Sequence, residues 1–184
     1  MLARVSFRPP RLTTPRLVLR GYEETDAPHI FRYASDAETT QFMSWDTLRS
    51  VADALEFLNG SVATHYEAGE LDYVITLPGD DRPIGGLAAC WRGRAEQVME
   101  LGYILRKDHW GNGYVAEAGR ALMAHAFAST DVERIFAPIF APNLRSCRAA
   151  EKMGMKLDGV LRSHRVMRGR RWDEAIYSTL RHDL

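Results

Sequence analysis

Cysteine is scarce in this sequence, and long apolar runs are missing from it. Only two cysteines occur among 184 residues, Cys90 and Cys147. Two are too few for a disulfide framework or a metal cluster, so we expect a reducing, cytoplasmic compartment and no bound metal. No apolar run approaches the roughly 20 residues that span a membrane, and residues 1–10 contain no apolar core of signal-peptide length. The sequence therefore predicts neither a secreted protein nor a membrane protein.

An excess of either charge is also missing, because 24 lysines and arginines balance 24 aspartates and glutamates. This balance argues against nucleic acid or an anionic membrane as the main partner. Internal repeats and low-complexity segments are absent too, so there is no sign of a repeat architecture. The length is sufficient for a sizeable core, and we expect a single domain over residues 1–184.

The stretch from Glu100 to Phe127 joins a strand pattern to a helix pattern through a turn that contains glycine. Residues 98–105 alternate between two faces, and parity places Glu100 on the same face as Gly102. A polar turn follows, then Trp110-Gly111-Asn112-Gly113. From residue 115 onward, apolar residues at 3.6 spacing predict a helix that reaches about residue 127.

A strand, a glycine-bearing turn and a helix in this order are suited to binding a phosphate. The first N–H groups of the helix have no partner and lie at the positive end of its dipole. Gly111 and Gly113 would let the backbone approach the anion closely, although the alternative is that they only shape the turn. The spacing matches neither a Walker loop nor the G-x-G-x-x-G dinucleotide fingerprint, because Ala116 stands where the last glycine would be.

The rest of the chain reads as alternating short strands and helices. We expect a first strand within residues 11–22, entered after Pro15, and a helix capped by Thr25 or Asp26 that runs to about residue 35. Further expected elements are a helix over residues 48–68, strands at 73–77, 84–91 and 135–139, a helix at 143–153, and a closing hairpin of 160–167 and 172–180.

A second polar segment, Asn143-Leu144-Arg145-Ser146, opens the helix that ends at Gly154. By itself it could be no more than a well-capped amphipathic helix. The two segments together carry a resemblance, however. Y-I-L-x(4)-W-G-N-G-Y-V-A-E-A resembles the acyl-CoA-binding motif of the GNAT superfamily of N-acyltransferases, and N-L-R-S followed by E-K-M-G-M resembles the N-x-x-S/A…E-K-x-G-F segment of the same family. More narrowly, the chain is similar to the RimJ/RimL-type branch, which acetylates the N-termini of ribosomal proteins.

The resemblance implies an α/β (α+β) fold, with a mixed and mostly antiparallel sheet of seven strands and about four helices. It implies an acyl-CoA-binding core at about residues 96–155 and acetyl-CoA as co-substrate, without a metal. The residues implied for cofactor binding, either through the backbone or as part of the motif, are Tyr103, Ile104, Leu105, Trp110, Gly111, Asn112, Gly113, Tyr114, Val115, Ala116, Asn143 and Ser146.

The acceptor pocket of the resembled family is lined by the connection between the first two helices, which here contains Phe42 and Trp45. The alternative is that these aromatics only fill an edge of the core. Five arginines in the last hairpin could select an acidic acceptor or hold a phosphate, or could form a solvated rim. Arginine also stands near Leu161, where the branch often carries a carboxylate, and this departure weakens the assignment of a ribosomal-protein substrate.

Glu100 is our candidate general base, because strand parity places it one step from the expected reacting centre and a lone carboxylate is costly to bury in a strand. The alternative is that Glu100 sits on a solvated face or pairs with Arg92 or Arg94. Many superfamily members place a tyrosine four residues after the position of Ser146, as the acid for the leaving group. Ala150 occupies that position here, so Ser146 is our candidate donor to the thiolate, although it could instead satisfy local backbone groups.

The acceptor implied by the branch is a protein or peptide N-terminal α-amine. An α-amine is roughly a tenth neutral at pH 7, whereas a lysine is neutral in only about 0.04% of molecules, so a weak base suffices for the former. The alternatives are a small amine such as an antibiotic, a polyamine or an amino acid, and a non-catalytic acyl-CoA-binding module. We expect direct transfer in a ternary complex, by a monomer or a homodimer.

Overall fold

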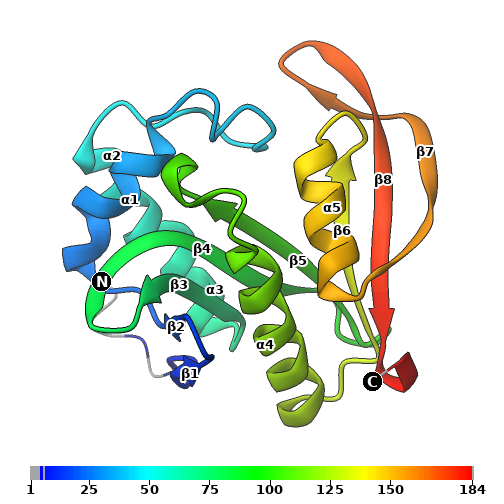
Figure 1. The fold of residues 1–184 in the computed structure, drawn as a ribbon, viewed down its shortest axis with the longest axis horizontal. Coiled ribbons are helices and arrows are strands. Elements are labelled where there is room, and N and C mark those ends of the chain that lie inside the picture. The colour runs from blue at the N-terminus through cyan, green and yellow to red at the C-terminus, as the bar shows by residue number, and fades with distance from the viewer. Residues whose placement is uncertain (1–4, 6, 184) are drawn as a thin grey trace.

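A computed structural model of the chain describes residue 5 and residues 7–183. The two ends of the predicted 1–184 domain, and half of the segment 1–10 in which we expected no signal peptide, lie outside the described residues. Within the described residues, eight strands form one sheet in the order β1-β2-β3-β4-β5-β6-β8-β7 (Figure 1). Their bounds are β1 (Leu12–Thr13), β2 (Val18–Arg20), β3 (Leu71–Leu77), β4 (Asp80–Gly93), β5 (Val98–Leu105), β6 (Arg134–Phe140), β7 (Lys156–Met167) and β8 (Arg170–Leu180).

The sheet confirms the expected fold class and corrects the number of strands from seven to eight. All neighbouring strands pair antiparallel except β5 and β6, which are parallel. The extra strand is β1, which folds back on β2 across Pro15 and pairs Leu12 with Leu19. Proline has no N–H to donate to a neighbouring strand and its φ angle is fixed. Segment 11–22 therefore turns at Pro15 and forms two short paired strands.

Helices cover both faces of the sheet. Their bounds are α1 (Ala27–Ala34), α2 (Val51–Phe57), α3 (Ala63–Glu67), α4 (Tyr114–Ser129) and α5 (Leu144–Met153), with short 3-10 turns η2 (Glu24–Asp26), η4 (Lys107–His109) and η5 (Arg181–Asp183). Tyr73 and Ile75 of β3 belong to the core beneath α4 and α5, and Val74 of the same strand belongs to the separate core beneath α1, α2 and α3. Odd and even residues of one strand therefore enter two different cores. Among the described helices, none is long and apolar enough to cross a membrane.

The helix expected over residues 48–68 is present but is not regular. α2 and α3 are joined end to end by a π-helical turn, η3 (Leu58–Val62), which contains Gly60. Ser50 caps α2 by accepting a hydrogen bond from the backbone N–H of Asp53 at 3.2 Å. Gly69 ends α3 with a φ angle of +69°, a conformation that glycine adopts without a side-chain clash. Counted as one, α2 to α3 brings the number of long helices to the four that were expected.

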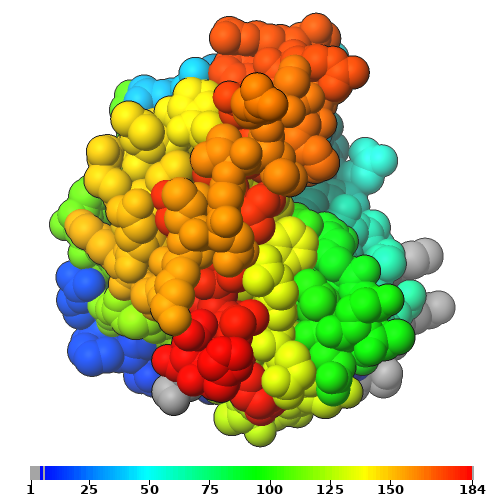
Figure 2. Space-filling view, turned by 90° about the vertical axis from the view of Figure 1, so that its right-hand side faces the viewer, coloured from blue at the N-terminus to red at the C-terminus, as the bar shows by residue number. Residues whose placement is uncertain are grey.

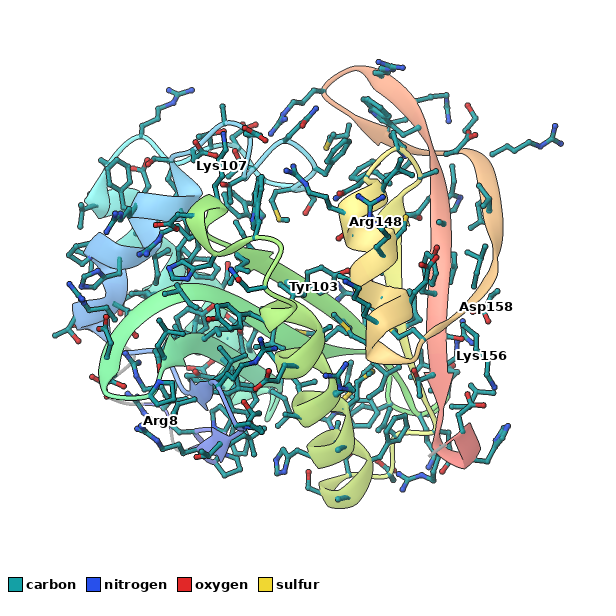
Figure 3. All side chains as sticks on the ribbon, viewed as in Figure 1. Arg8, Tyr103, Lys107, Arg148, Lys156 and Asp158 are labelled. Carbon is teal, nitrogen blue, oxygen red and sulfur yellow. The ribbon has the colours of Figure 1, made fainter. Side chains whose placement is uncertain are left out.

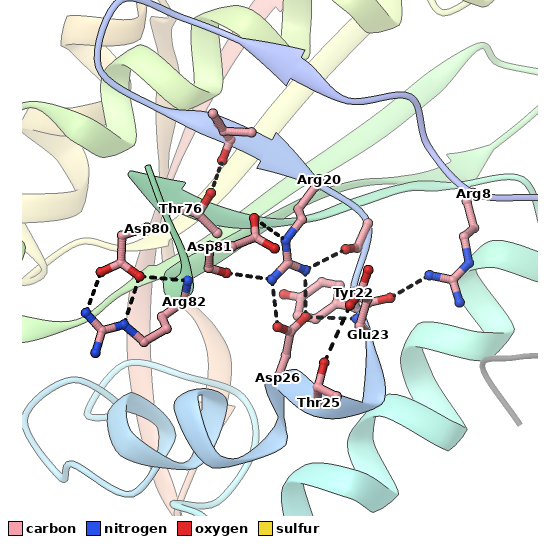
Figure 4. Close-up of polar contacts among 12 residues, drawn as sticks. Arg8, Arg20, Tyr22, Glu23, Thr25, Asp26, Thr76, Asp80, Asp81 and Arg82 are labelled. Carbon is pink, nitrogen blue, oxygen red and sulfur yellow. Dashed lines mark hydrogen bonds and ion pairs between the residues drawn. The ribbon is translucent and has the colours of Figure 1, made fainter. Parts of the chain in front are cut away.

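Arg20 ties the first half of the sheet to α1 (Figure 4). Its guanidinium is buried, and Nη1 and Nη2 each donate to one oxygen of Asp26 at 2.8 Å. The same side chain reaches the turn between β3 and β4, where Nε donates to the Asp81 carboxylate at 3.0 Å. Asp26 also accepts from the backbone N–H of Glu23 at 2.8 Å. Asp26 therefore occupies the N-cap position of α1, one of the two caps expected, but its side chain closes the capping box of η2 and makes no cap hydrogen bond to α1.

The closing hairpin, β7 and β8, forms the outer edge of the sheet. Figure 2 shows β7, in orange, crossing this side of the molecule, with the tip of the hairpin projecting beyond the body. The tip is anchored because Arg168 donates to the backbone carbonyls of Gln41 at 3.2 Å and Trp45 at 3.5 Å. Residues 36–50 and the hairpin therefore enclose the end of the sheet at which β5 and β6 separate.

Candidate active site

The parallel pairing of β5 with β6 is short, and the two strands separate beyond it. Their register runs from Val98 opposite Arg134 to Glu100 opposite Phe136 and then stops. The remainder of β5, from Gly102 to Leu105, has its other edge on β4 but has no strand beside it on this side among the described residues. The fork between the two strands is visible in Figure 1 as the wedge between β5 and the layer of α5 and β6. Glu100 lies at the point where the fork begins.

The glycine-bearing turn follows β5 directly and opens α4. Gly111 and Gly113 have φ angles of +82° and +76°, which other residues rarely adopt. Gly113 is the N-terminal cap of α4, and the backbone N–H of Glu117 donates to its carbonyl at 3.0 Å. The N–H groups of Tyr114, Val115 and Ala116 are thus those of a first helical turn, which have no partner within the helix. This is the geometry of an anion site, with the dipole of a 16-residue helix behind it.

Side chains of the turn hold its shape. The indole Nε1 of Trp110 donates to the carbonyl of Leu105 at 2.7 Å, which closes the turn onto the end of β5. Asn112 Nδ2 donates to the carbonyls of His109 at 3.1 Å and Trp110 at 3.3 Å. The Arg145 guanidinium stacks 3.7 Å from the centre of the Trp110 ring. The side chains of Trp110 and Asn112 therefore stabilise the turn by binding its backbone carbonyls. The backbone N–H groups that begin α4 stay available to bind an anion.

Glu117 and Arg16 support the same turn, and sequence analysis overlooked both. Glu117 Oε1 accepts from the Thr14 hydroxyl at 2.6 Å and the Arg16 backbone N–H at 3.0 Å, while Oε2 accepts from Arg16 Nε at 2.7 Å. Burial opposes the charge on Glu117, but these hydrogen bonds outweigh burial and lower the pKa of its carboxyl. Arg16 Nη1 in turn donates to the carbonyl of Asn112 at 3.0 Å. The turn between β1 and β2 thereby fixes the position of the glycine turn.

A cavity of about 390 Å³ extends from this turn into the fork. Figure 3 shows Tyr103 in the gap between β5 and α5, with Arg148 on α5 near it. Of the residues expected to bind cofactor, all but Asn112 line this cavity; they are Tyr103, Ile104, Leu105, Trp110, Gly111, Gly113, Tyr114, Val115, Ala116, Asn143 and Ser146. Asn143 also caps α5, since its Oδ1 accepts from the backbone N–H of Ser146 at 3.3 Å. Arg145, Arg148 and Lys152 add positive charge to the lining.

A second, smaller cavity of about 130 Å³ lies at the start of the fork. Phe42 lines both cavities, whereas Trp45 is not among the residues that line either one. Glu100 lines the smaller cavity and also forms the ion pair considered as an alternative, because Arg92 Nε donates to its Oε2 at 2.8 Å. Arg165 lines the same cavity from β7.

A buried carboxylate on β8 faces the arginines of β7 within the last hairpin. Glu174 on β8 lies opposite Leu161 and is almost fully buried. Its Oε1 accepts from Arg165 Nη1 at 2.6 Å, so the charge of Arg165 is neutralised within the protein. Two further hairpin arginines have partners: Arg170 stacks 4.0 Å from the centre of the Trp172 ring, and Arg171 donates to the Ser163 carbonyl at 3.1 Å. These contacts favour a structural role for Arg165, Arg170 and Arg171.

Ser146 and Tyr103 meet where the two cavities join. The Ser146 hydroxyl donates to the Tyr103 hydroxyl at 3.0 Å, and the Tyr103 hydroxyl donates to the Ser146 carbonyl at 3.0 Å. Burial raises the pKa of Tyr103 to about 12, even though the hydrogen bond with Ser146 acts to lower it. Tyr103 is therefore neutral and a hydrogen-bond donor at physiological pH. Ala150 is fully buried in the core, so in this chain a tyrosine from β5 stands beside Ser146.

Comparison with known proteins agrees with this geometry. Residues 16–156 match the family model described as the acetyltransferase (GNAT) domain. The uncharacterized N-acetyltransferase YoaA of Bacillus subtilis is 28% identical over 172 residues, which cover 94% of this chain and 97% of YoaA.

Two solved structures share the fold at lower identity. RimL, a ribosomal L7/L12 alpha-N-protein acetyltransferase solved with coenzyme A, has a TM-score of 0.83 at 20% identity and covers 93% of this chain and 98% of its own. The microcin C7 self-immunity acetyltransferase MccE, solved with acetyl-CoA and AMP, has a TM-score of 0.82 at 20% identity, with 91% and 93% coverage. With its fork, its glycine turn and this family match, the chain belongs to the GNAT acetyltransferase family, whose members transfer acetyl groups from acetyl-CoA.

Proposed function

We propose that this protein transfers the acetyl group of acetyl-CoA to a primary amine, and that the leading acceptor is the N-terminal α-amine of a protein or peptide. One observation carries the proposal: the cavity that begins at the glycine turn meets a second cavity at Ser146 and Tyr103, inside the fork between β5 and β6. A thioester in the first cavity and an amine in the second would meet there. Holding two reactants in line supplies a large share of the rate of such a transfer.

Acetyl-CoA would occupy the first cavity. The N–H groups of the turn and the first helical turn, residues 111–116, would bind the pyrophosphate. The open edge of β5 at Tyr103–Leu105 would hold the pantetheine arm as an additional strand, with the carbonyl of Leu105 already taken by Trp110. Asn143 would contact the same arm from the start of α5. Arg148 and Lys152 would add favourable charge for the phosphates.

The amine must lose a proton before it can attack. Glu100 would take that proton, directly or through one water molecule, because its carboxylate lines the second cavity at the start of the fork. Its ion pair with Arg92 fixes the carboxylate through Oε2. The amine nitrogen then bonds to the acetyl carbonyl carbon, the carbon–sulfur bond breaks, and the sulfur leaves as the thiolate of coenzyme A. The nitrogen releases its second proton to solvent as the amide forms.

The thiolate would be stabilised by the Ser146 hydroxyl. This hydroxyl is held by Tyr103, and a hydroxyl can rotate to donate its proton to a better acceptor. Full protonation is unnecessary, because a thiol with a pKa of about 8.5 leaves without it. Ser146 is thus the proposed catalytic donor, and Tyr103 is a positioning residue that holds Ser146 from β5.

A small free amine is the second candidate acceptor, and one feature favours it. The second cavity is only about 130 Å³, and the hairpin tip is tied across its outer side by Arg168. A peptide would place its first residue there and leave the remainder outside, whereas a compact amine would fit entirely. Both acceptors use the same transfer chemistry.

The deciding experiment measures release of coenzyme A from acetyl-CoA with matched acceptors. The set is a series of short peptides with free N-termini, the same peptides with acetylated N-termini, and a panel of polyamines, amino acids and aminoglycosides. Turnover that requires a free peptide N-terminus would support the leading proposal. Turnover on small amines alone would replace it with the second candidate. Tight acetyl-CoA binding without turnover on any acceptor would contradict both.

The proposed base has its own test. Glu100→Gln should slow turnover most at low pH, where little of the acceptor is neutral, and should leave acetyl-CoA affinity nearly unchanged. Glu96→Gln, an exposed carboxylate in the turn before β5, is the matched control and should leave the pH–rate profile as it was. A wild-type profile in Glu100→Gln would exclude Glu100 as the base.

A further inference from the structure

A second group of reactive side chains lies on the opposite face of the sheet from α4 and α5. His65 is on α3, Glu70 immediately precedes β3, and Cys90 is on β4. One donor atom from each, a ring nitrogen, a carboxylate oxygen and the thiol sulfur, lies within 4.8 Å of the other two. Glu70 and Cys90 are buried, and the His65 side chain is 32% exposed, so His65 is the most accessible member of the group.

The imidazole of His65 is oriented by a fourth residue. Asp72, whose side chain is buried, places its Oδ2 2.7 Å from His65 Nδ1. The other ring nitrogen, Nε2, faces the Oε2 of Glu70 at 3.8 Å. Glu70 is oriented as well, because its Oε1 accepts from the backbone N–H of Trp91 at 3.2 Å. A histidine held by a carboxylate at one nitrogen, with the other presented to a further ligand, is the usual outer support of a metal site.

We propose that His65 Nε2, Glu70 Oε2 and Cys90 Sγ bind one divalent cation of the zinc type. One nitrogen, one oxygen and one sulfur donor suit Zn²⁺, which takes four ligands at about 2.0–2.3 Å and leaves one position here for water. Ligand atoms around such an ion are about 3.2–3.8 Å apart. The separation of 3.8 Å between His65 and Glu70 is therefore already suitable, and the sulfur needs a displacement of an ångström or less.

Binding would balance the local charge. The Cys90 thiol releases its proton to solvent as the thiolate binds, and His65 binds as neutral imidazole. The thiolate and the Glu70 carboxylate then offset the two charges of the ion. The site would also join three elements, since its ligands come from α3, the start of β3 and β4. Cys90 lies directly opposite Glu100 in the β4–β5 register, but the inference does not depend on the proposed catalytic role of that residue.

No motif in the sequence indicates this site, and from the sequence we expected no bound metal. The three ligands are 5 and 20 residues apart along the chain, and they match no metal-binding spacing such as C-x₂-C or H-x₃-H. The donors meet only because a helix end, a strand start and a neighbouring strand converge. Glu70, Asp72 and Cys90 share one face, because Asp72 lies opposite Ala88 and side chains two residues apart point the same way.

Cobalt is the best probe, because a cobalt–thiolate bond gives a strong near-ultraviolet absorption that colourless zinc lacks. The experiment titrates Co²⁺ into the full-length, metal-free protein under a reductant that contains no thiol. We expect the charge-transfer band to saturate at one equivalent and to be abolished by one equivalent of Zn²⁺. We also expect Zn²⁺ to raise the melting temperature by about 5 °C or more when it is well above its dissociation constant.

Variants assign the ligands. Cys90→Ser should abolish the thiolate band, and His65→Ala should weaken binding at least about tenfold. Because His65→Ala also leaves the buried Asp72 carboxylate without its imidazole partner, the folding of this variant is checked by its melting curve. Asp72→Asn should lower affinity about 10- to 100-fold as an outer support. Cys147→Ser and His125→Ala are the controls, and both should keep the band. Absence of any band, or a band that persists in Cys90→Ser and disappears in Cys147→Ser, would overturn the proposal.

Discussion

The contact between Tyr103 and Ser146 gives the sharpest prediction. Ser146→Ala removes the hydroxyl that would stabilise the leaving thiolate, and Tyr103→Phe removes the group that holds that hydroxyl in place at 3.0 Å. Removing a donor that stabilises charge in the transition state costs about 10²–10³ in kcat at oxyanion sites. A thiolate of low basicity needs less help, so we expect kcat to fall about 10- to 100-fold in Ser146→Ala, or about 1.4–2.7 kcal/mol.

Tyr103→Phe should reduce kcat about 5- to 10-fold, with KM for acetyl-CoA nearly unchanged, because the serine keeps its hydroxyl but loses its orientation. Since Tyr103 acts through Ser146, the double variant should be no slower than Ser146→Ala. Two neutral hydrogen bonds are also lost, each of about 1 kcal/mol, so the melting temperature should fall by about 4–8 °C. Assays well below that temperature separate the two effects.

The pH–rate profile tests whether Tyr103 stays protonated while it holds Ser146. Because burial raises the pKa of Tyr103 to about 12, its hydroxyl stays protonated throughout the usual assay range. Ionisation of Tyr103 should therefore cause no decrease in kcat of the wild-type protein up to about pH 10. The pH–rate profiles of wild-type protein and Tyr103→Phe should have the same shape over that range. Strictly additive effects of the two single substitutions, or wild-type kcat in Ser146→Ala, would refute the reasoning. Cys147→Ser, one residue away and buried, is the matched control for α5.

Three further predictions concern the supports of the site. Glu117→Ala leaves Thr14 and Arg16 without their carboxylate partner, so we expect the free energy of unfolding to fall by about 2–3 kcal/mol and the KM for acetyl-CoA to rise. Melting curves measure the first effect and steady-state kinetics the second. An unchanged KM would contradict the anchoring role of Glu117. Asp26→Asn removes the charge that pairs with the buried Arg20 and should lower the free energy of unfolding by about 2–4 kcal/mol. Asp80→Asn is the control, because its ion pair with Arg82 is solvent-exposed. An equal decrease in Asp80→Asn would show that burial is not the cause. Burial, followed by the charge of Arg106, lowers the pKa of His109, so the unfolded chain binds more protons and stability is lost as pH falls below about 6.5. His109→Gln should abolish that part of the loss, and identical pH–stability curves for the two proteins would contradict it.

Local signals were sufficient for the elements that carry the site. The alternation of β5, the two glycines after Trp110 and the polar start of α5 are each encoded within about ten neighbouring residues, and the structure places all three around one cavity. The split of the first strand was also a local effect, of Pro15, but its consequence was a separate eighth strand that the pattern did not predict.

Contacts between distant residues could not be predicted in the same way. Tyr103 meets Ser146 across 43 positions of sequence, and Arg16 meets Glu117 across 101. Glu117 lies among the residues of α4 that the apolar spacing does not include, and nothing in the helix pattern shows that the β1–β2 turn packs there. These pairings depend on how the sheet is ordered, and no single segment contains that information.

Two cavities meet at the fork between β5 and β6. The cavity at the glycine turn and the smaller cavity at Glu100 share the five residues Phe42, Met43, Tyr103, Asn143 and Ser146, and each extends away from them in its own direction. With acetyl-CoA in the first cavity and the amine in the second, as proposed, neither substrate would have to pass through the site of the other. We therefore expect a sequential mechanism without a compulsory order, in which initial-velocity lines intersect and a dead-end analogue of either substrate competes only with that substrate. Desulfo-coenzyme A and a blocked acceptor amine would each report on one entrance.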